Sequence, residues 1–304
     1  MKYAVTESDR RPLPESYRVE HRHLGYVADE VTRPFARFYD STVRPIQDTA
    51  REALLAGAQP GELAYEVDDA PRRLSAKGYE PMESGWARTD HGTLVVACHT
   101  DMPDVTAAMW DWWFGWHGTD TARYKLWHPG AHQFSAVGED RSGFRELTDR
   151  QRYIDNVSYV DEYVGDSLSQ LAIRFVNPTS FGFEDRPGTT HICARVTASN
   201  LPVAAGWLIH QVRPTESGSE MRSRFFMGHA EVLDLPATSV SNQTGGRLFA
   251  NPAGRRALAP IVRRLGAHVS NMNLGRALMH HCASEMNHLA GFLPELFTEF
   301  RATP

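Results

Sequence analysis

The sequence lacks the features of membrane, secreted and polyanion-binding proteins. Residues 1–11 are polar and charged, and the longest apolar runs, such as residues 94–98, have the length of a strand rather than of a membrane span. The 3 cysteines are widely spaced without a CxxC pair, which favours free thiols in the cytoplasm over a disulfide framework. The net charge is only −5, with 23% charged residues. We therefore expect a cytoplasmic globular protein with neither a membrane nor a nucleic acid as its partner.

Several common catalytic motifs are also missing. The chain has no GxGxxG fingerprint, no P-loop and no GxSxG nucleophile elbow. Residues 165–169 spell GDSLS, the nucleophile block of the GDSL esterases, but that chemistry needs a histidine held by an aspartate, and no aspartate follows Asp234. Because the block also falls at a predicted hairpin turn, we interpret it as a chance match.

Histidine, in contrast, is abundant. The chain has 14 histidines among 304 residues, and its 41% of hydrophobic residues is enough for one large domain or a large domain with a smaller partner. Histidine is the commonest metal ligand and a proton carrier near neutral pH. The placement of the histidines is therefore the first functional clue.

The N-terminal part, residues 1–90, is punctuated by prolines and predicts a mainly helical lobe with loops. Its best periodic stretch, residues 31–55, predicts an amphipathic helix bent at Pro45. A second domain is expected over residues 91–304. It begins with a buried strand at residues 93–99, followed by a helix that Asp104 caps and that runs to about His117.

Six alternating segments and one long helix follow in this second domain. The segments are typical of antiparallel hairpins and cover residues 132–137, 157–164, 168–176, 191–198, 203–212 and 220–232. Residues 269–300 carry apolar side chains at helical spacing. This order favours an α+β fold, in which a curved antiparallel sheet wraps a C-terminal helix.

Two acidic residues and one histidine in these elements are candidate metal ligands. His281 and Glu285 lie four residues apart, so both can reach one cation from one face of the last helix, although such a pair is often only a solvated surface pair. Apolar neighbours indicate that this helix is partly buried, which favours the ligand interpretation. Glu162 shares a predicted strand face with Val160 and Val164; the alternative is that Asp161 faces inward and Glu162 outward.

Two further histidines, His128 and His132, are separated by Pro129 and Gly130, so they cannot form a helical pair. His132 opens a strand and alternates with Phe134 and Ala136 toward one face. We therefore predict His132 as the inward ligand and keep His128 as the alternative.

Residues 110–117, WDWWFGWH, are unusually rich in aromatic side chains. Such a block packs in a core or lines a pocket for a flat aromatic substrate, and the sequence leaves both interpretations open.

Four blocks of the chain form a distinctive series. In chain order they are MWDWWF at 109–114, YKLWHPGAH at 124–132, RSRFF at 222–226, and HCASEM at 281–286 with FLP at 292–294. Together they resemble the 2,4-diacetylphloroglucinol hydrolase family, which also includes phloretin hydrolase. The resemblance extends from about residue 90 to the C-terminus, while residues 1–90 match only in size. It implies a Bet v 1-like helix-grip domain and, as the family suggests, a homodimer.

The same resemblance implies the residues of an active site. It implies a zinc ion held by His132, Glu162, His281 and Glu285. A substrate-orienting tyrosine falls on Tyr124, and the family's further active-site histidine falls on His210. Two positions depart from the family pattern: its substrate-binding asparagine is Ser135 here, and an expected tyrosine is Phe225 or Phe226.

Two functions from different classes follow. The first is a zinc-dependent hydrolase that cleaves the carbon–carbon bond between an acyl group and a phenolic ring of a small aromatic ketone and releases a carboxylic acid. The second is a non-catalytic helix-grip binder of an aromatic or polyketide ligand, walled by the tryptophan-rich helix. The four-residue metal constellation separates the two, because a carrier does not require it.

Overall fold

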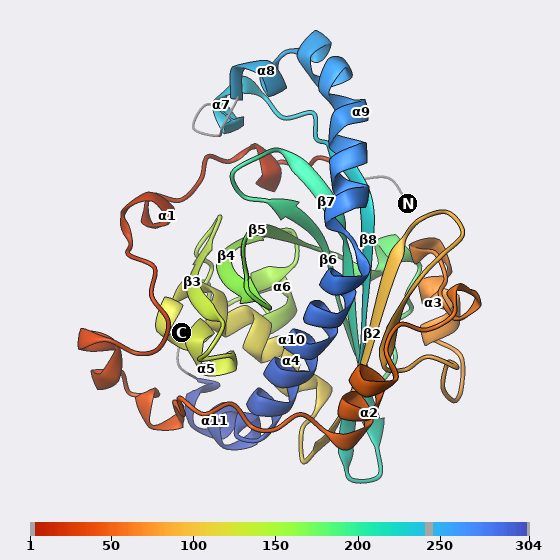
Figure 1. Ribbon diagram of the computed structural model, residues 1–304. Coiled ribbons are helices and arrows are strands. Elements are labelled where there is room, and N and C mark those ends of the chain that lie inside the picture. Colours follow the sequence, from red (N-terminus) through yellow and green to blue (C-terminus); the bar gives the residue numbers. More distant parts are fainter. Residues whose placement is uncertain (1–3, 241–245, 303–304) are drawn as a thin grey trace.

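A single antiparallel sheet dominates the computed structural model, which describes residues 4–240 and 246–302 (Figure 1). The strand order is β1-β2-β8-β7-β6-β5-β4-β3, so β1 and β3 are the two edges. The eight strands are β1 (Gly85–Arg88), β2 (Leu94–Pro103), β3 (His132–Val137), β4 (Val157–Val164), β5 (Ser167–Val176), β6 (Thr190–Ala198), β7 (Val203–Thr215) and β8 (Gly218–Val232).

The six predicted hairpin strands are all present, and the α+β class is confirmed. β3 and β4 have the predicted bounds, and the other four extend past them by a few residues. The residues that resemble the GDSL block form the tight turn and start of β5, with Gly165 at a φ of +62°. A residue in this left-handed conformation is what a two-residue hairpin turn requires.

The helices lie at both faces and at the ends of the sheet. Those of the described chain are α1 (Ser16–Val19), α2 (Asp48–Ala56), α3 (Ala70–Leu74), α4 (Ala107–Trp116), α5 (Thr121–Trp127), α6 (Asp149–Tyr153), α7 (Ala237–Val240), α8 (Gly246–Ala250), α9 (Pro252–Val269), α10 (Met272–Ala290) and α11 (Leu293–Phe300).

Helix α10 crosses one face of the sheet, which we call the inner face (Figure 1). Met279, Cys282, Met286 and Leu289 of α10 are fully buried against it, in the same core cluster as α4 and α5. The spacing of these four residues follows the helical period, so one stripe of α10 removes its apolar area from water. The inner face between α10, α4 and α5 is therefore where buried side chains from distant segments meet.

The opposite, outer face is covered in part by residues that precede β2. Tyr65, Val67, Leu74 and Met82 pack there against Phe226 of β8 and its neighbours. Strand β1 falls inside the range 1–90 and pairs with β2, so the sheet begins before residue 91. The division at residue 90 otherwise stays a prediction.

Three local expectations were wrong. Residues 31–55 do not form one bent helix: two short 3-10 helices precede α2, because Pro34 and Pro45 each lack an amide donor and stop helical hydrogen bonding. Asp104 does not cap α4. It has a φ of +64°, and Thr106 is the cap, whose hydroxyl accepts from the Met109 amide.

The third wrong expectation concerns the C-terminal part of the chain, where two helices replace the single helix expected over residues 269–300. α10 ends at Ala290, with Gly291 and Phe292 between it and α11. Pro294 stands in the first turn of α11, where its missing amide hydrogen leaves no bond unmade.

Two negative findings apply to the described part of the chain. No helix there is both long and apolar enough to cross a membrane. Cys98, Cys193 and Cys282 are free thiols, and all three are buried.

Candidate metal centre

Four side chains from three elements converge on the inner face. His132 Nε2 lies 3.8 Å from Glu162 Oε2 and 3.5 Å from Glu285 Oε2. His281 Nε2 lies 3.9 Å from Glu162 Oε1 and 3.6 Å from Glu285 Oε2. All four residues are at least nine-tenths buried. We call these residues the His/Glu cluster.

Local geometry and strand pairing together build the cluster. His281 and Glu285 share one face of α10 through their four-residue spacing. β3 and β4 are antiparallel neighbours in which His132 stands opposite Glu162. Directly opposed residues on one face of a sheet have their side chains within reach of each other, and α10 closes the site over them.

A β-bulge in β3 changes which face of the sheet its later side chains point to. The register shifts between His132 and Phe134, so Phe134 pairs with Asp161 and lies on the other face from His132. The expected alternation of His132, Phe134 and Ala136 on one face was therefore wrong, because the extra residue of a bulge reverses all later side chains of the strand. Phe134 instead packs against Tyr17 and under the Arg22 guanidinium.

The same pairing decides between Glu162 and Asp161. Glu162 faces the cluster, whereas Asp161 faces outward. There the Asp161 carboxylate accepts hydrogen bonds from Arg22 Nε at 2.9 Å and from the Tyr17 hydroxyl at 3.1 Å. Both partners come from the N-terminal segment and satisfy the Asp161 carboxylate, so only Glu162 is left to the inner face.

His132 is prepared to donate an electron pair. Its Nδ1 is 3.0 Å from the Tyr124 carbonyl oxygen, which accepts the ring N–H and leaves Nε2 as the unprotonated nitrogen. Nε2 is buried, points into the cluster and has no hydrogen-bond partner. A buried polar atom without a partner is costly, and a cation among these four side chains would satisfy it.

The spacing of the donors also fits a metal ion. Zinc binds imidazole nitrogen and carboxylate oxygen at about 2.1 Å in a tetrahedron, whose edges are then about 3.4 Å long. The four separations of 3.5–3.9 Å are close to such edges and too long for good hydrogen bonds. The ligand atoms of His132, Glu162 and His281 all lie within 4.8 Å of one another.

Electrostatics in the cluster are dominated by burial and by the two carboxylates. Burial, with the neighbouring Glu162 charge, raises the pKa of Glu285 despite the opposing effect of His281. Burial alone would lower the pKa of His281, but the Glu285 and Glu162 carboxylates outweigh it and raise that pKa to about 9. Negative charge confined in this way favours a bound cation.

Tyr124 and His128 flank the cluster. The Tyr124 hydroxyl donates to Glu162 Oε2, and its ring stacks on His132 with centroids 3.8 Å apart and planes at 2°. Burial, reinforced by the Glu162 charge, raises the pKa of Tyr124 well above its usual value, so the hydroxyl stays a donor. The His128 ring stacks on His281 at 5.2 Å, outside the group of converging ligand atoms.

His210 and Phe225 lie on the inner face of the neighbouring strands β7 and β8. His210 Nδ1 is 2.8 Å from Ser223 Oγ, and its ring contacts Phe225 and Phe114. Burial lowers the pKa of His210 to about 3, so the imidazole is neutral at pH 7. Phe226 packs on the outer face, so of the two phenylalanines only Phe225 shares the face of His210.

Ser135 is buried and follows the β3 bulge, opposite Val160 of the inner core. The bulge therefore places Ser135 on the same face as His132. Its hydroxyl donates to the Gly118 carbonyl at 3.0 Å, which leaves its oxygen free to accept.

Sequence reasoning missed the packing that supports the cluster. His117 stacks between Trp113 and Tyr124, and Trp127 packs edge-on against His132. The aromatic block at residues 110–117 was the available signal, because helical spacing places Trp113 and His117 on one face of α4 and its extension.

A second His/acid group lies at the sheet edge remote from α5. It comprises His99, Asp101 and Glu220. The Glu220 carboxylate already accepts from His99 Nε2 at 2.6 Å, from the Tyr79 hydroxyl at 3.0 Å and from Arg213. This group is an internally satisfied network, whereas the His/Glu cluster contains an unpartnered nitrogen.

Comparisons with known proteins find relatives along most of the chain. A sequence model of the family described as DAPG hydrolase PhiG domain matches residues 65–298. A 2,4-diacetylphloroglucinol hydrolase of Pseudomonas protegens is 27% identical over 281 residues, covering 88% of this chain and 85% of that protein. Phloretin hydrolase of Eubacterium ramulus is 26% identical over 284 residues, covering 92% and 95%.

Among solved structures, a norcoclaurine synthase of Thalictrum flavum matches with a TM-score of 0.28 and 12% identity, over 59% of this chain and 92% of that one. A likeness this low carries no argument. The family match, in contrast, spans well over half of the sequence, including β1 to β8 and α10. The chain therefore belongs to the DAPG hydrolase family.

Proposed function

We propose that this chain is a zinc-dependent hydrolase that cleaves the carbon–carbon bond between an acyl group and a phenolic ring of the acylphloroglucinol type. Membership of the family makes it a hydrolase of carbon–carbon bonds in ketonic substances. The relatives are named for 2,4-diacetylphloroglucinol and for phloretin, both aryl ketones with a hydroxylated ring. The nature of the metal and of the acyl group is our proposal.

The single observation that carries it is the His/Glu cluster with its unpartnered His132 Nε2. His132, Glu162, His281 and Glu285 would hold the ion. Zinc bound there would polarise an acyl carbonyl and acidify a water molecule, less strongly than at a three-histidine site because two carboxylates balance its charge. A non-catalytic binder would not need such a cluster, and the comparisons do not favour one.

The reaction consumes one water. The water oxygen forms a bond to the acyl carbon, the bond from that carbon to the ring breaks, and the ring carbon takes up a proton, so a carboxylic acid and the deacylated phenol are released. Protonation of the ring carbon first gives a β-diketone-like tautomer, from which the ring departs as a stabilised enol. The protein must therefore supply a proton acceptor for water and a way to return a proton to carbon.

His210 is our candidate for proton transfer. Its neutral state at pH 7, the result of burial, fits a proton acceptor better than an acid. Its hydrogen bond with Ser223 Oγ holds the ring in one orientation. His210 faces the same side of the sheet as Phe225, which we propose as a wall for the substrate ring.

Tyr124 and Ser135 are proposed to orient the substrate hydroxyls. The Tyr124 hydroxyl already donates to Glu162, so the oxygen can accept a hydrogen bond from a ring hydroxyl of the substrate. Ser135 likewise keeps its acceptor lone pairs. Tyr124 would thereby couple the position of Glu162 to the position of the substrate.

A metal assay and a turnover assay on matched variants test the proposal. His281→Ala should lose stoichiometric zinc and the release of acid from 2,4-diacetylphloroglucinol and phloretin. His280→Ala removes the neighbouring, exposed histidine of the same helix and should lose neither. Full zinc content and activity in His281→Ala, or stoichiometric binding of a different metal by the wild-type protein, would overturn the assignment.

The proposal also covers the domain organisation, the cellular setting and the oligomeric state of the protein. α10 against the curved sheet supports a Bet v 1-like helix-grip domain over residues 91–304, and the N-terminal lobe of residues 1–90 adds the edge strand β1 to its sheet. The unpaired cysteines support a reducing, cytoplasmic setting. A homodimer is expected from the family resemblance, and light scattering after gel filtration measures it directly.

A further inference from the structure

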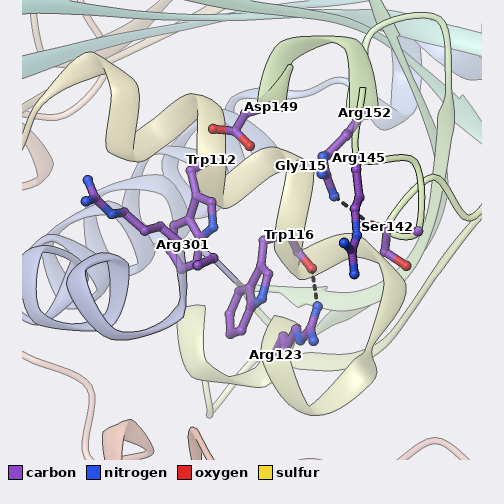
Figure 2. Close-up of a pocket in the computed structure, with 11 residues that line it drawn as sticks. Trp112, Gly115, Trp116, Arg123, Ser142, Arg145, Asp149, Arg152 and Arg301 are labelled. Carbon is purple, nitrogen blue, oxygen red and sulfur yellow. Dashed lines mark hydrogen bonds between the residues drawn. The ribbon is translucent and has the colours of Figure 1, made fainter. Parts of the chain in front are cut away.

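A cavity lies away from the His/Glu cluster. Its volume is about 540 Å³, within the range of small-molecule sites. Figure 2 shows the arginine side chains distributed on different sides of two indole rings. Its aromatic and basic lining consists of Trp112, Trp116, Arg123, Arg145, Arg152 and Arg301.

Helix α4 separates this cavity from the metal centre. Trp113, and His117 just beyond the helix, face the cluster through their stacking on each other and on Tyr124. Trp112 and Trp116, again four residues apart, form another face that lines the cavity. The two sites therefore use different faces of the same aromatic segment.

The lining of the cavity is strongly positive. It contains four arginines and one acidic residue, the half-buried Asp149, in a protein whose net charge is −5. Within residues 4–240 and 246–302, Arg145 and Arg301 form no ion pair and Arg152 Nε is buried without a hydrogen-bond partner. Guanidinium groups gathered in a concave site repel one another and attract an anion.

The arrangement is partly rigid. Arg152 Nη1 donates to the Ser142 carbonyl at 2.9 Å, which fixes the guanidinium at the cavity wall. Arg123 Nη1 donates to the Trp116 carbonyl at 3.0 Å, and its guanidinium carbon lies 4.2 Å from the centre of the Trp116 ring. These groups need little reordering to bind a ligand, which lowers the entropic cost of binding.

The aromatic wall adds a preference for a flat ligand. The Trp112 and Trp116 rings stack with centroids 4.9 Å apart and planes at 23°. The Trp116 indole N–H is buried without a hydrogen-bond partner. A planar ring with an anionic group would use the indole surface and the guanidinium donors at once.

We propose that this cavity is a binding site for a small aromatic carboxylate. The carboxylate would pair with guanidinium groups, which match its two oxygens, and the ring would pack on Trp112 and Trp116. The inference does not rest on the proposed reaction, since it needs no metal and no residue of the His/Glu cluster.

Isothermal titration calorimetry with benzoate as the probe tests the proposal on the full chain. Benzoate should bind with one site, and about tenfold more tightly than acetate or inorganic phosphate, which lack the ring. In Arg145→Gln/Arg301→Gln its affinity should fall by about tenfold, because two positive charges of the lining are removed. Both positions are exposed, so folding should be retained, as circular dichroism will show.

Two controls make the outcome decisive. Arg263→Gln/Arg264→Gln removes the same charge from the exposed face of α9 and should leave benzoate binding unchanged. Glu285→Gln alters the His/Glu cluster and should also leave it unchanged. The proposal is overturned if benzoate does not bind, if phosphate binds as tightly as benzoate, if both arginine pairs weaken binding equally, or if only Glu285→Gln abolishes it.

Discussion

Tyr124→Phe gives the sharpest test of the metal centre, because it removes one hydrogen bond and leaves the packing in place. The Tyr124 hydroxyl donates to Glu162, a proposed zinc ligand, while the ring stacks on His132 at a centroid distance of 3.8 Å. Phenylalanine keeps that stacking. A hydrogen bond to a charged group contributes about 1.5–3 kcal/mol, and loss of a partner of a metal ligand typically costs about 10–100-fold in affinity. We therefore expect zinc affinity to fall by about 10–100-fold.

Competition with a chromogenic zinc chelator measures this change. Tyr153→Phe is the matched control, because the hydroxyl of the buried Tyr153 also donates to a carboxylate, that of the half-buried Asp111, at 2.8 Å from Oδ1, but away from the cluster. Both variants should lose similar stability, and only Tyr124→Phe should lose zinc affinity. Unchanged zinc affinity in Tyr124→Phe, or an equal loss in Tyr153→Phe, would refute the reasoning.

The same variant separates two roles of the hydroxyl. If it acts only through Glu162, activity should return at saturating zinc. If it also holds a ring hydroxyl of the substrate, KM should remain raised after the metal is restored.

Three further predictions concern stability. Chelation of zinc should lower the Tm by several degrees, because zinc at about 100 times its Kd contributes about 2.7 kcal/mol to stability. Thermal unfolding scans with and without EDTA measure this change, and equal Tm values would argue against bound metal. Burial raises the pKa of Glu83, but the Arg222 and Arg224 guanidiniums outweigh it and lower that pKa to about 2. Since this folded-state pKa is depressed, Glu83 contributes about 3 kcal/mol to stability above pH 4.5, and this contribution is lost as the pH falls toward 2. Urea titrations of wild type and Glu83→Gln should therefore show their free energies of unfolding converging between pH 4.5 and 2. A difference that stays constant over this range would contradict the prediction. Gly275→Ala should destabilise by about 1–3 kcal/mol, because its new methyl would lie 2.7 Å from an indole carbon of β1, whereas the methyl of Gly143→Ala meets nothing within 4 Å and should change little.

The sequence determined the elements whose patterns are local. Alternation of period two marked the strands from β3 to β8, since a half-buried strand shows this pattern without reference to its neighbours. The spacing of His281 and Glu285 determined that they share a face of α10, because helical geometry depends only on the backbone of that segment. These features were correct in the structure.

Local expectations failed where the chain itself offered competing signals. Asp104 and Thr106 are both good caps, and the left-handed backbone at Asp104 left the role to Thr106. The prolines at 34 and 45 broke a helix that apolar spacing alone suggested.

The tertiary structure decided what depends on pairing between distant segments. The bulge after His132 appears only when β3 meets β4, and it moves Phe134 outward and Ser135 inward. Asp161 is satisfied by Arg22 and Tyr17, which lie about 140 residues earlier in the chain, so Glu162 alone remains for the cluster. The arginine-lined cavity likewise joins Arg301, which follows α11, to Arg123, Arg145 and Arg152 from the middle of the chain. Spacing along one element is set by its own backbone, whereas register, bulges and cavities follow from long-range contacts that no local pattern encodes.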